Sequence, residues 1–158
     1  MKVVIDAYDG RTSFYVFDTE DPIIAAYRRV FPSLFQDASA MPAGLRDHVR
    51  YPELLLSLQA EVYGLYHMTD PQMFYNREDL WNVPSEVSLS PRGEQIAQTM
   101  QPNFVLMKLP AESGLEFVEI LPFTPANRNN MIGWIAGRSD AAHYGNAVVY
   151  DFPKNQAD

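Results

Sequence analysis

Two stretches of the chain combine side chains whose types could support binding or catalysis. The first, YHMTDPQMFYNREDLWNVP, covers residues 66 to 84 and places one histidine, three acids and one arginine among aromatic residues. His67 and Asp70 lie three residues apart, and neutral imidazole and carboxylate groups are common metal ligands. Because a metal site needs at least three protein ligands, and His48 and His143 are distant in the sequence, we expect no metal.

The same stretch also fits a junction between helices. Asp70 precedes Pro71, and a carboxylate in this position caps a helix by accepting hydrogen bonds from its first free backbone N–H groups. Asn76, followed by two acids, repeats this start signal. Because capping accounts for most of the polar residues, we interpret the stretch as a helix junction. His67 and Asp70 remain a secondary candidate site.

The second stretch, FTPANRNNMIGWIAGRSD at residues 123 to 140, is the preferred candidate for a ligand site. Guanidinium groups bind carboxylates and phosphates through paired hydrogen bonds, and this stretch holds two arginines beside asparagines and glycines. The candidate ligand-binding residues are Arg128, Asn129, Asn130, Trp134, Arg138 and Asp140. The alternative is structural: Asn127 caps a short helix, and both arginines pair with acids. That helix would carry Met131, Ile132, Trp134 and Ile135.

No motif identifies a catalytic centre. The sequence contains no HExxH, P-loop, GxGxxG or GxSxG pattern. Serine, histidine and aspartate can still assemble in space, and an enzyme built on this chain would draw first on His67, Asp70 and Arg138. We assign no catalytic residue and no cofactor, and we expect binding rather than catalysis.

Composition and charge narrow the class of protein. The chain has 158 residues, of which 47% are hydrophobic, and this suits one packed globular domain. Its net charge of -8 repels phosphate groups, so nucleic acid and anionic membrane surfaces are not expected partners. The absence of cysteine excludes disulfides and thiolate chemistry. No run approaches the ~18 apolar residues of a membrane span, so we expect no direct membrane insertion.

Strands are expected near both ends of the chain, with helices between them. Residues 3–5 and 13–17 flank the turn pair Asp9-Gly10 and predict a β-hairpin. Prolines 22, 52 and 71 stand where helices begin. The helix over residues 52–67 carries an apolar stripe with steps of three or four. This stripe consists of Leu55, Leu58, Val62, Leu65 and Tyr66.

The second half of the chain predicts a hairpin over residues 103–123 and a final strand over 146–152. A connector rich in proline, serine and glycine, at 83–95, precedes them. Separate runs of strands and helices indicate an α+β fold. We expect an antiparallel or mixed sheet of about five strands with about four helices packed on it, in a single soluble domain over residues 1–158.

Several long strings give the chain a family resemblance. VVIDAYDG, MPAGLRDHVRYPE, YHMTDPQMFYNREDLWNVP, ILPFTPANRNNMIGWIAGRSD and YGNAVVYDFPK follow one another in order. With them the chain closely resembles the bacterial uncharacterised protein family 0182 over nearly its whole length. The resemblance implies a piece excised from the soluble region of a large integral membrane protein with transmembrane helices ahead of that region. It implies no reaction, substrate or catalytic residue.

The residues and the resemblance together favour a non-catalytic role. We expect an extracytoplasmic binding, sensing or assembly domain of a bacterial membrane protein. Its partners would be its own transmembrane region or other membrane and envelope proteins. Two alternatives stay open: an enzyme that acts on an envelope or small-molecule substrate, and an architectural domain that packs on its own transmembrane part.

Overall fold

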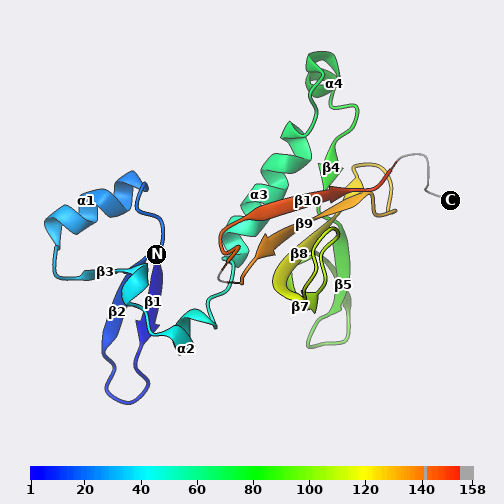
Figure 1. Ribbon diagram of the computed structural model, residues 1–158. Coiled ribbons are helices and arrows are strands. Elements are labelled where there is room, and N and C mark those ends of the chain that lie inside the picture. Colours follow the sequence, from blue (N-terminus) through cyan, green and yellow to red (C-terminus); the bar gives the residue numbers. More distant parts are fainter. Residues whose placement is uncertain (141, 154–158) are drawn as a thin grey trace. The chain divides into compact units, whose positions relative to one another are not determined.

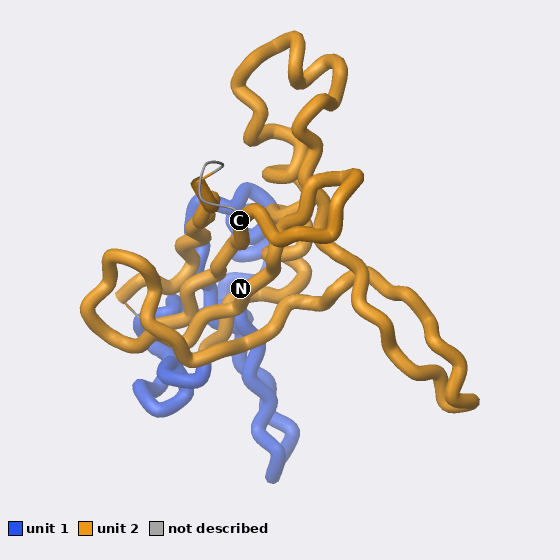
Figure 2. Tube along the Cα trace, turned by 90° about the vertical axis from the view of Figure 1, so that its right-hand side faces the viewer, with its two compact units in different colours: residues 1–48 blue, residues 49–158 orange. Residues whose placement is uncertain are grey.

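The computed structural model describes residues 1–140 and 142–153. The chain divides into two compact units, unit 1 at residues 1–48 and unit 2 at residues 49–158 (Figures 1 and 2). A single domain is what length and composition predict, and neither property marks a boundary near residue 48. Each unit is therefore described by itself.

Unit 1 is a three-stranded sheet with one main helix. Strands β1 (Lys2–Ile5) and β2 (Thr12–Val16) form the predicted antiparallel hairpin, and β3 (Phe35–Asp37) pairs parallel to β2. The positive φ angle of 75° at Gly10 closes the hairpin loop, a conformation that favours glycine. The short helices η1 (Ala38–Ala40) and α2 (Ala43–Arg46) end the unit.

Helix α1 (Pro22–Val30) connects β2 to β3 in unit 1, and its start follows from the local sequence. The Asp21 carboxylate accepts hydrogen bonds from the backbone N–H groups of Ile23 and Ile24, at 2.8 and 3.3 Å. Pro22 occupies the first turn, where its missing N–H costs nothing. The Asp-Pro pair therefore places the helix start where the sequence predicts it.

Unit 2 is built around a five-stranded sheet. Four strands follow one another along the chain as antiparallel neighbours: β7 (Asn103–Met107), β8 (Glu116–Pro125), β9 (Gly133–Arg138) and β10 (Ala147–Asp151). The short strand β4 (Trp81–Asn82) also pairs with β8. The α+β class, the β7–β8 hairpin and the final strand are thus confirmed, whereas the N-terminal hairpin lies in the separate sheet of unit 1.

Residues 133–138 form strand β9, so the interpretation that Asn127 begins a short helix is wrong. Ile132 N donates to Phe123 O at the start of the β8–β9 pairing. Along β9, Ile135 is buried on one face of the sheet while Trp134 packs in the apolar cluster on the other. A helix buries one stripe, whereas a strand inside a sheet buries both faces, and the apolar run here suits the strand.

Strand β8 contains a proline at a point where the sheet tolerates one. Pro122 faces Trp134 of β9, and on its other side it lies between two pairings. The β7 pairing extends to Ile120, and the β4 pairing begins at Thr124. Because proline has no N–H to donate, this interval between two short partners is a suitable position for it.

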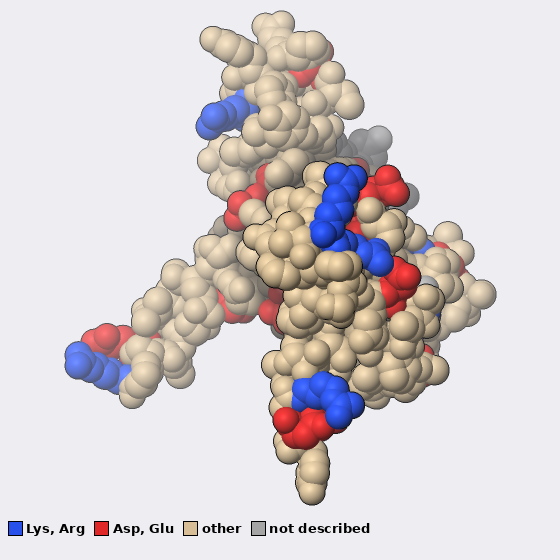
Figure 3. Space-filling view, turned by 90° about the vertical axis from the view of Figure 1, so that its left-hand side faces the viewer, with Lys and Arg blue, Asp and Glu red and all other residues tan. Residues whose placement is uncertain are grey.

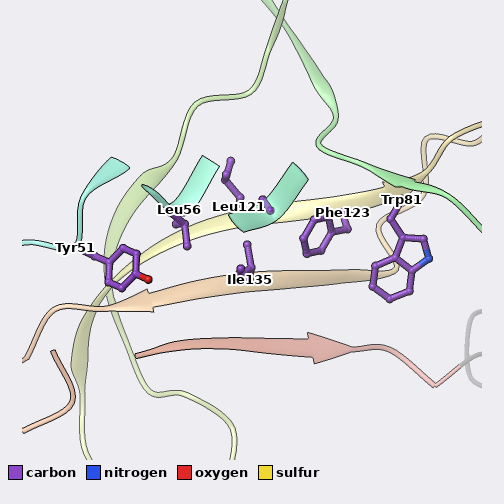
Figure 4. Packing of buried hydrophobic residues seen from close by; sticks show 7 residues of the cluster. Tyr51, Leu56, Trp81, Leu121, Phe123 and Ile135 are labelled. Atoms are coloured by element: carbon purple, nitrogen blue, oxygen red, sulfur yellow. The ribbon is translucent and has the colours of Figure 1, made fainter. Parts of the chain in front are cut away.

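Helix α3 (Glu53–Tyr66) covers one face of the sheet of unit 2 (Figure 1). Its buried residues are Leu56, Ala60 and Gly64, which repeat every four positions and share one side of the helix. Figure 4 shows Leu56 close to the side chains that the sheet contributes to this core. The cluster comprises Tyr51, Leu56, Ala60, Trp81, Leu121, Phe123 and Ile135.

The small residues of α3 set how closely the helix approaches the sheet. A Cβ atom on Gly64 would lie 2.4 Å from the carbonyl oxygen of Trp81 in β4, so only glycine fits without a shift. The predicted apolar stripe lies on the opposite side of the helix. Its members Leu58 and Val62 are 51% and 57% exposed. Because α3 is apolar on several sides, periodicity alone does not show which side meets the sheet.

The opposite face of the sheet carries a second apolar cluster. Leu109, Val118 and Ala136 are buried there. Trp134 and Tyr150 stack with ring centroids 4.5 Å apart. These aromatic rings come from neighbouring strands, so cross-strand packing holds this face together.

A two-stranded arm accounts for most of the segment that the sequence suggests is a connector. Strands β5 (Ser85–Leu89) and β6 (Gln95–Thr99) pair with each other and extend from the body of unit 2 (Figure 2). Gly93, with a φ angle of 80°, lies in the turn. The arm is polar and largely exposed, and this is why its alternation of apolar residues is too weak to predict a strand.

Candidate functional site

The structure gives the stretch at residues 66–84 mainly capping and packing roles. The Asp70 carboxylate accepts from the N–H groups of Gln72 and Met73 at 2.8 and 2.9 Å, and it thereby caps helix α4 (Pro71–Asn76). Asn76 does not begin another helix, in contrast to the prediction. It ends α4, and Arg77 follows in a left-handed conformation with a φ angle of 55°, which turns the chain toward β4.

His67 is held inside this junction. Its Nδ1 lies 3.1 Å from the carbonyl oxygen of Tyr63, and its ring centroid lies 4.0 Å from that of Trp81. Its Nε2 is 3.8 Å from an oxygen of Asp79, with the side chain only 10% exposed. The carboxylate near His67 is therefore that of Asp79, at a distance too long for a hydrogen bond, while Asp70 caps α4. In the described parts of the chain, no group of three His, Cys, Asp or Glu residues is arranged to hold a metal.

Arg138 is the centre of a buried ion cluster. Its Nε donates to Glu116 Oε2 at 2.7 Å, and its Nη2 donates to the other oxygen of the same carboxylate. Nη2 also lies 2.8 Å from Glu112 Oε1. The hydrogen bond from Arg138 lowers the pKa of Glu116 against the opposing effect of burial. The hydrogen bonds that Arg138 donates to Glu116 and Glu112 raise the pKa of Arg138.

This cluster fastens three segments together. Glu116 begins β8, Glu112 lies in the loop before it, and Arg138 ends β9. Since the guanidinium already makes the paired contact that would grip an anionic ligand, such a ligand would have to displace Glu112 or Glu116. In this geometry Arg138 has the structural role considered as the alternative from the sequence, because it pairs with acids.

The other candidate ligand-binding residues are separated along β9. Arg128, Asn129 and Asn130 are exposed in the turn before the strand. Asp140 lies beyond its other end, where its Oδ1 accepts from Phe117 N at 3.4 Å. A strand rises about 3.3 Å per residue, so six residues separate these two groups by about 20 Å. The structure places Trp134 between them, stacked on Tyr150, and does not bring the six residues into one site.

Tyr51 is a buried residue that the sequence does not single out. Its ring packs against Gly137, where a Cβ atom would approach the ring to 2.5 Å. Its hydroxyl donates to Gln59 Oε1 at 2.7 Å, and its backbone N–H donates to Ser139 Oγ at 3.0 Å. Burial raises the pKa of Tyr51, and the charge of Glu119 adds to this effect. Tyr51 thus fastens the start of α3 to β9.

The largest unassigned feature of unit 2 is the side of α3 that faces away from the sheet. Five large apolar or aromatic side chains are exposed there: Leu54 74%, Leu55 44%, Leu58 51%, Val62 57% and Tyr66 66%. A contiguous apolar strip of this kind marks an interaction surface more often than an ordinary solvent-facing side. The sequence already indicates this surface, because four of these five residues belong to the apolar stripe predicted for the helix.

The structure thus defines a class: an α+β region whose buried polar clusters make internal contacts and which exposes an apolar strip on α3. The chain belongs to the Uncharacterised protein family UPF0182, whose family model matches residues 1–157. The resemblance inferred from the quoted strings is confirmed.

Curated relatives place the chain in much longer proteins. It is 47% identical over 156 residues to a UPF0182 protein of Pelotomaculum thermopropionicum, and 49% identical over 156 residues to UPF0182 protein bll7333 of Bradyrhizobium diazoefficiens. Each match covers 99% of this chain and 16% of the relative. The chain therefore spans about a sixth of the length of these relatives. No solved structure matches it.

Among the described helices, none has the length and apolar character needed to cross a membrane. Charged side chains are distributed in small mixed groups on the face shown in Figure 3, with basic residues beside acidic ones. In unit 1, ion pairs join Arg28 to Asp37 at 2.9 Å and Arg11 to Asp9 at 3.3 Å. Such mixing does not favour a polyanionic partner.

Proposed function

We propose that this region is a non-catalytic assembly domain of a larger membrane protein, which binds through the outer side of α3. The observation that carries the proposal is the strip of exposed apolar side chains on a helix that is firmly packed on its other side. A region that forms about a sixth of its relatives has most of the polypeptide available to cover such a strip.

The occupied polar clusters support the same proposal. Arg138 is neutralised by two carboxylates, and Asp70 caps a helix, so both perform internal tasks. An enzyme acting on an envelope or small-molecule substrate would use convergent polar groups that remain available to a substrate. The geometry of these two residues favours binding through an apolar surface over catalysis.

A split-protein experiment tests the assembly role. The region and the remaining polypeptide of a full-length family member are expressed as separate chains, and their association is measured by co-purification. We expect association with the wild-type region and its loss with Leu58→Glu, which places a charge in the apolar strip. The matched control is Tyr75→Glu, at an 86% exposed aromatic residue of α4. Equal association of both variants would refute the proposal.

We also propose that the region lies outside the cytoplasm. The support is what the family resemblance implies, namely a large soluble region that follows transmembrane helices, and the relatives are long enough to hold such helices outside the matched region. The test uses the absence of cysteine from the chain. In a full-length protein whose cysteines outside this region have been replaced, a single Tyr75→Cys substitution should react with a membrane-impermeant maleimide in intact cells. Labelling only after the cells are opened would place the region inside.

A further inference from the structure

We infer that the outer side of α3 receives one α-helix from another part of the same polypeptide, lengthwise along α3. This inference rests on the proposed assembly role and specifies its partner. The exposed side chains present on the order of 500 Å2 of surface, which is more than half of what one partner contributes to a standard interface. A single helix lying along α3 would cover most of it.

The spacing of apolar residues on this side of α3 indicates that the partner is a helix. Leu55, Leu58 and Val62 of the strip are followed by the half-buried Leu65, at steps of three, four and three residues. This is the a and d pattern of two heptads, in which side chains of one helix insert between those of a second. Helices packed in this way cross at about 20°, so contact continues along the whole of α3, about 21 Å.

Length favours a partner from the same polypeptide. The matched region covers 16% of the relatives, and the other five-sixths of their length holds many segments that could supply one helix. A segment of the same polypeptide is also present at a high effective concentration, which favours its binding over that of a separate molecule.

Charge disfavours a second copy of this chain as the partner. Glu61 lies beside the apolar strip, the strip itself contains no basic residue, and the chain carries a net charge of -8. Two copies placed face to face on α3 would bring like charges together without a compensating pair. A helix with a basic residue opposite Glu61 would complement the strip better.

Photocrosslinking in the full-length polypeptide tests this inference. The photoreactive residue p-benzoylphenylalanine replaces Val62, which is 57% exposed and tolerates a larger side chain in its free state. The control places the same residue at Tyr75, which is already aromatic and 86% exposed. Circular dichroism of both variants establishes that each is folded. Crosslinked peptides are identified by mass spectrometry.

We expect irradiation to join position 62 to a peptide outside residues 1–158 of the same polypeptide, without a dimer-sized product, while position 75 gives no such link. A product of twice the mass would identify a second copy and overturn the inference, although an assembly role would stand. A link to a different protein, or to a residue within 1–158, would also overturn it. Absence of any product at position 62 would refute the helix and, with a negative split-protein result, the assembly role.

Discussion

Replacing Gly64 by alanine sets two effects of opposite sign against each other. In an exposed helix the change stabilises, because alanine has a higher helix propensity than glycine by up to about 1 kcal/mol. At position 64 the added methyl group would lie 2.4 Å from the carbonyl oxygen of Trp81, where ordinary contacts are 3.4–4 Å. Helix α3 or strand β4 must therefore move by about 1 Å.

The clash should outweigh the propensity. The group opposite Gly64 is a backbone carbonyl, which cannot rotate away as the end of a flexible side chain can. Overpacking a close contact costs about 1–3 kcal/mol, and the gain in propensity offsets about 1 kcal/mol at most. We expect a net loss of about 1–2 kcal/mol. For a unit of about this size, that corresponds to a fall of roughly 4–8 °C in Tm.

Both tryptophans of the chain, Trp81 and Trp134, lie in unit 2, so their fluorescence during guanidinium denaturation reports its unfolding. The control compares Glu61→Ala with Glu61→Gly on the same helix, at an exposed position, and measures the propensity term alone. If Gly64→Ala were more stable than wild type by as much as Glu61→Ala is more stable than Glu61→Gly, then α3 would not approach β4 as described.

Three further changes test the polar contacts. Asp70→Ala removes the cap of α4 and should cost about 1 kcal/mol in urea denaturation; unchanged stability would contradict the cap. Glu116→Gln should cost about 1.5–3 kcal/mol at pH 7. Arg138 lowers the pKa of Glu116, so the extra stability of the wild type is fully present above the ordinary pKa of 4.5 and is lost as the pH falls through the lowered pKa. The stabilities of the two proteins should therefore converge in acid. Parallel pH profiles would refute the ion pair. Burial raises the pKa of Tyr144 to about 12, so the folded chain keeps a proton that the unfolded chain releases near its ordinary value of 10. Stability should therefore fall between pH 10 and 12 and fall less in Tyr144→Phe, and an equal fall in both proteins would contradict the burial of the phenol.

The features predicted well from the sequence are those that depend on neighbouring residues. An aspartate followed by proline starts α1 at residue 22 and α4 at residue 71, because the cap and the restricted φ angle act within one turn. The β7–β8 hairpin and β10 follow from alternation and turn residues. In each case the physical cause lies within a few positions of its effect.

The features that the sequence did not predict depend on contacts between distant residues. Arg138 and Glu116 are 22 positions apart, and no local pattern announces their pairing. The 133–138 segment has apolar residues that a helix could also use, and only its position between β8 and β10 makes it a strand. Likewise, the side of α3 that packs inward is decided by Gly64, whose importance appears only when Trp81 lies against it.

The candidate ligand-binding residues also show that closeness in sequence does not establish closeness in space. The arginines and asparagines at 128–140 were grouped because they are close in sequence, but an extended strand separates its ends far more than a helix of equal length does. Because β9 is a strand, Arg138 at its end is far from Arg128 in the turn that precedes it. Predicting the site therefore required knowing the secondary structure first.

The β5–β6 arm is the part of unit 2 that should open, be cleaved and accept insertions most easily. A hairpin without further strands or a covering helix is held by few contacts, so it can open while the five-stranded sheet remains closed. Its amide protons should exchange with solvent early, and proteases should cut first near the turn at residues 90–94. By the same reasoning, the turn around Gly93 should accept an inserted tag or fluorophore without loss of the fold.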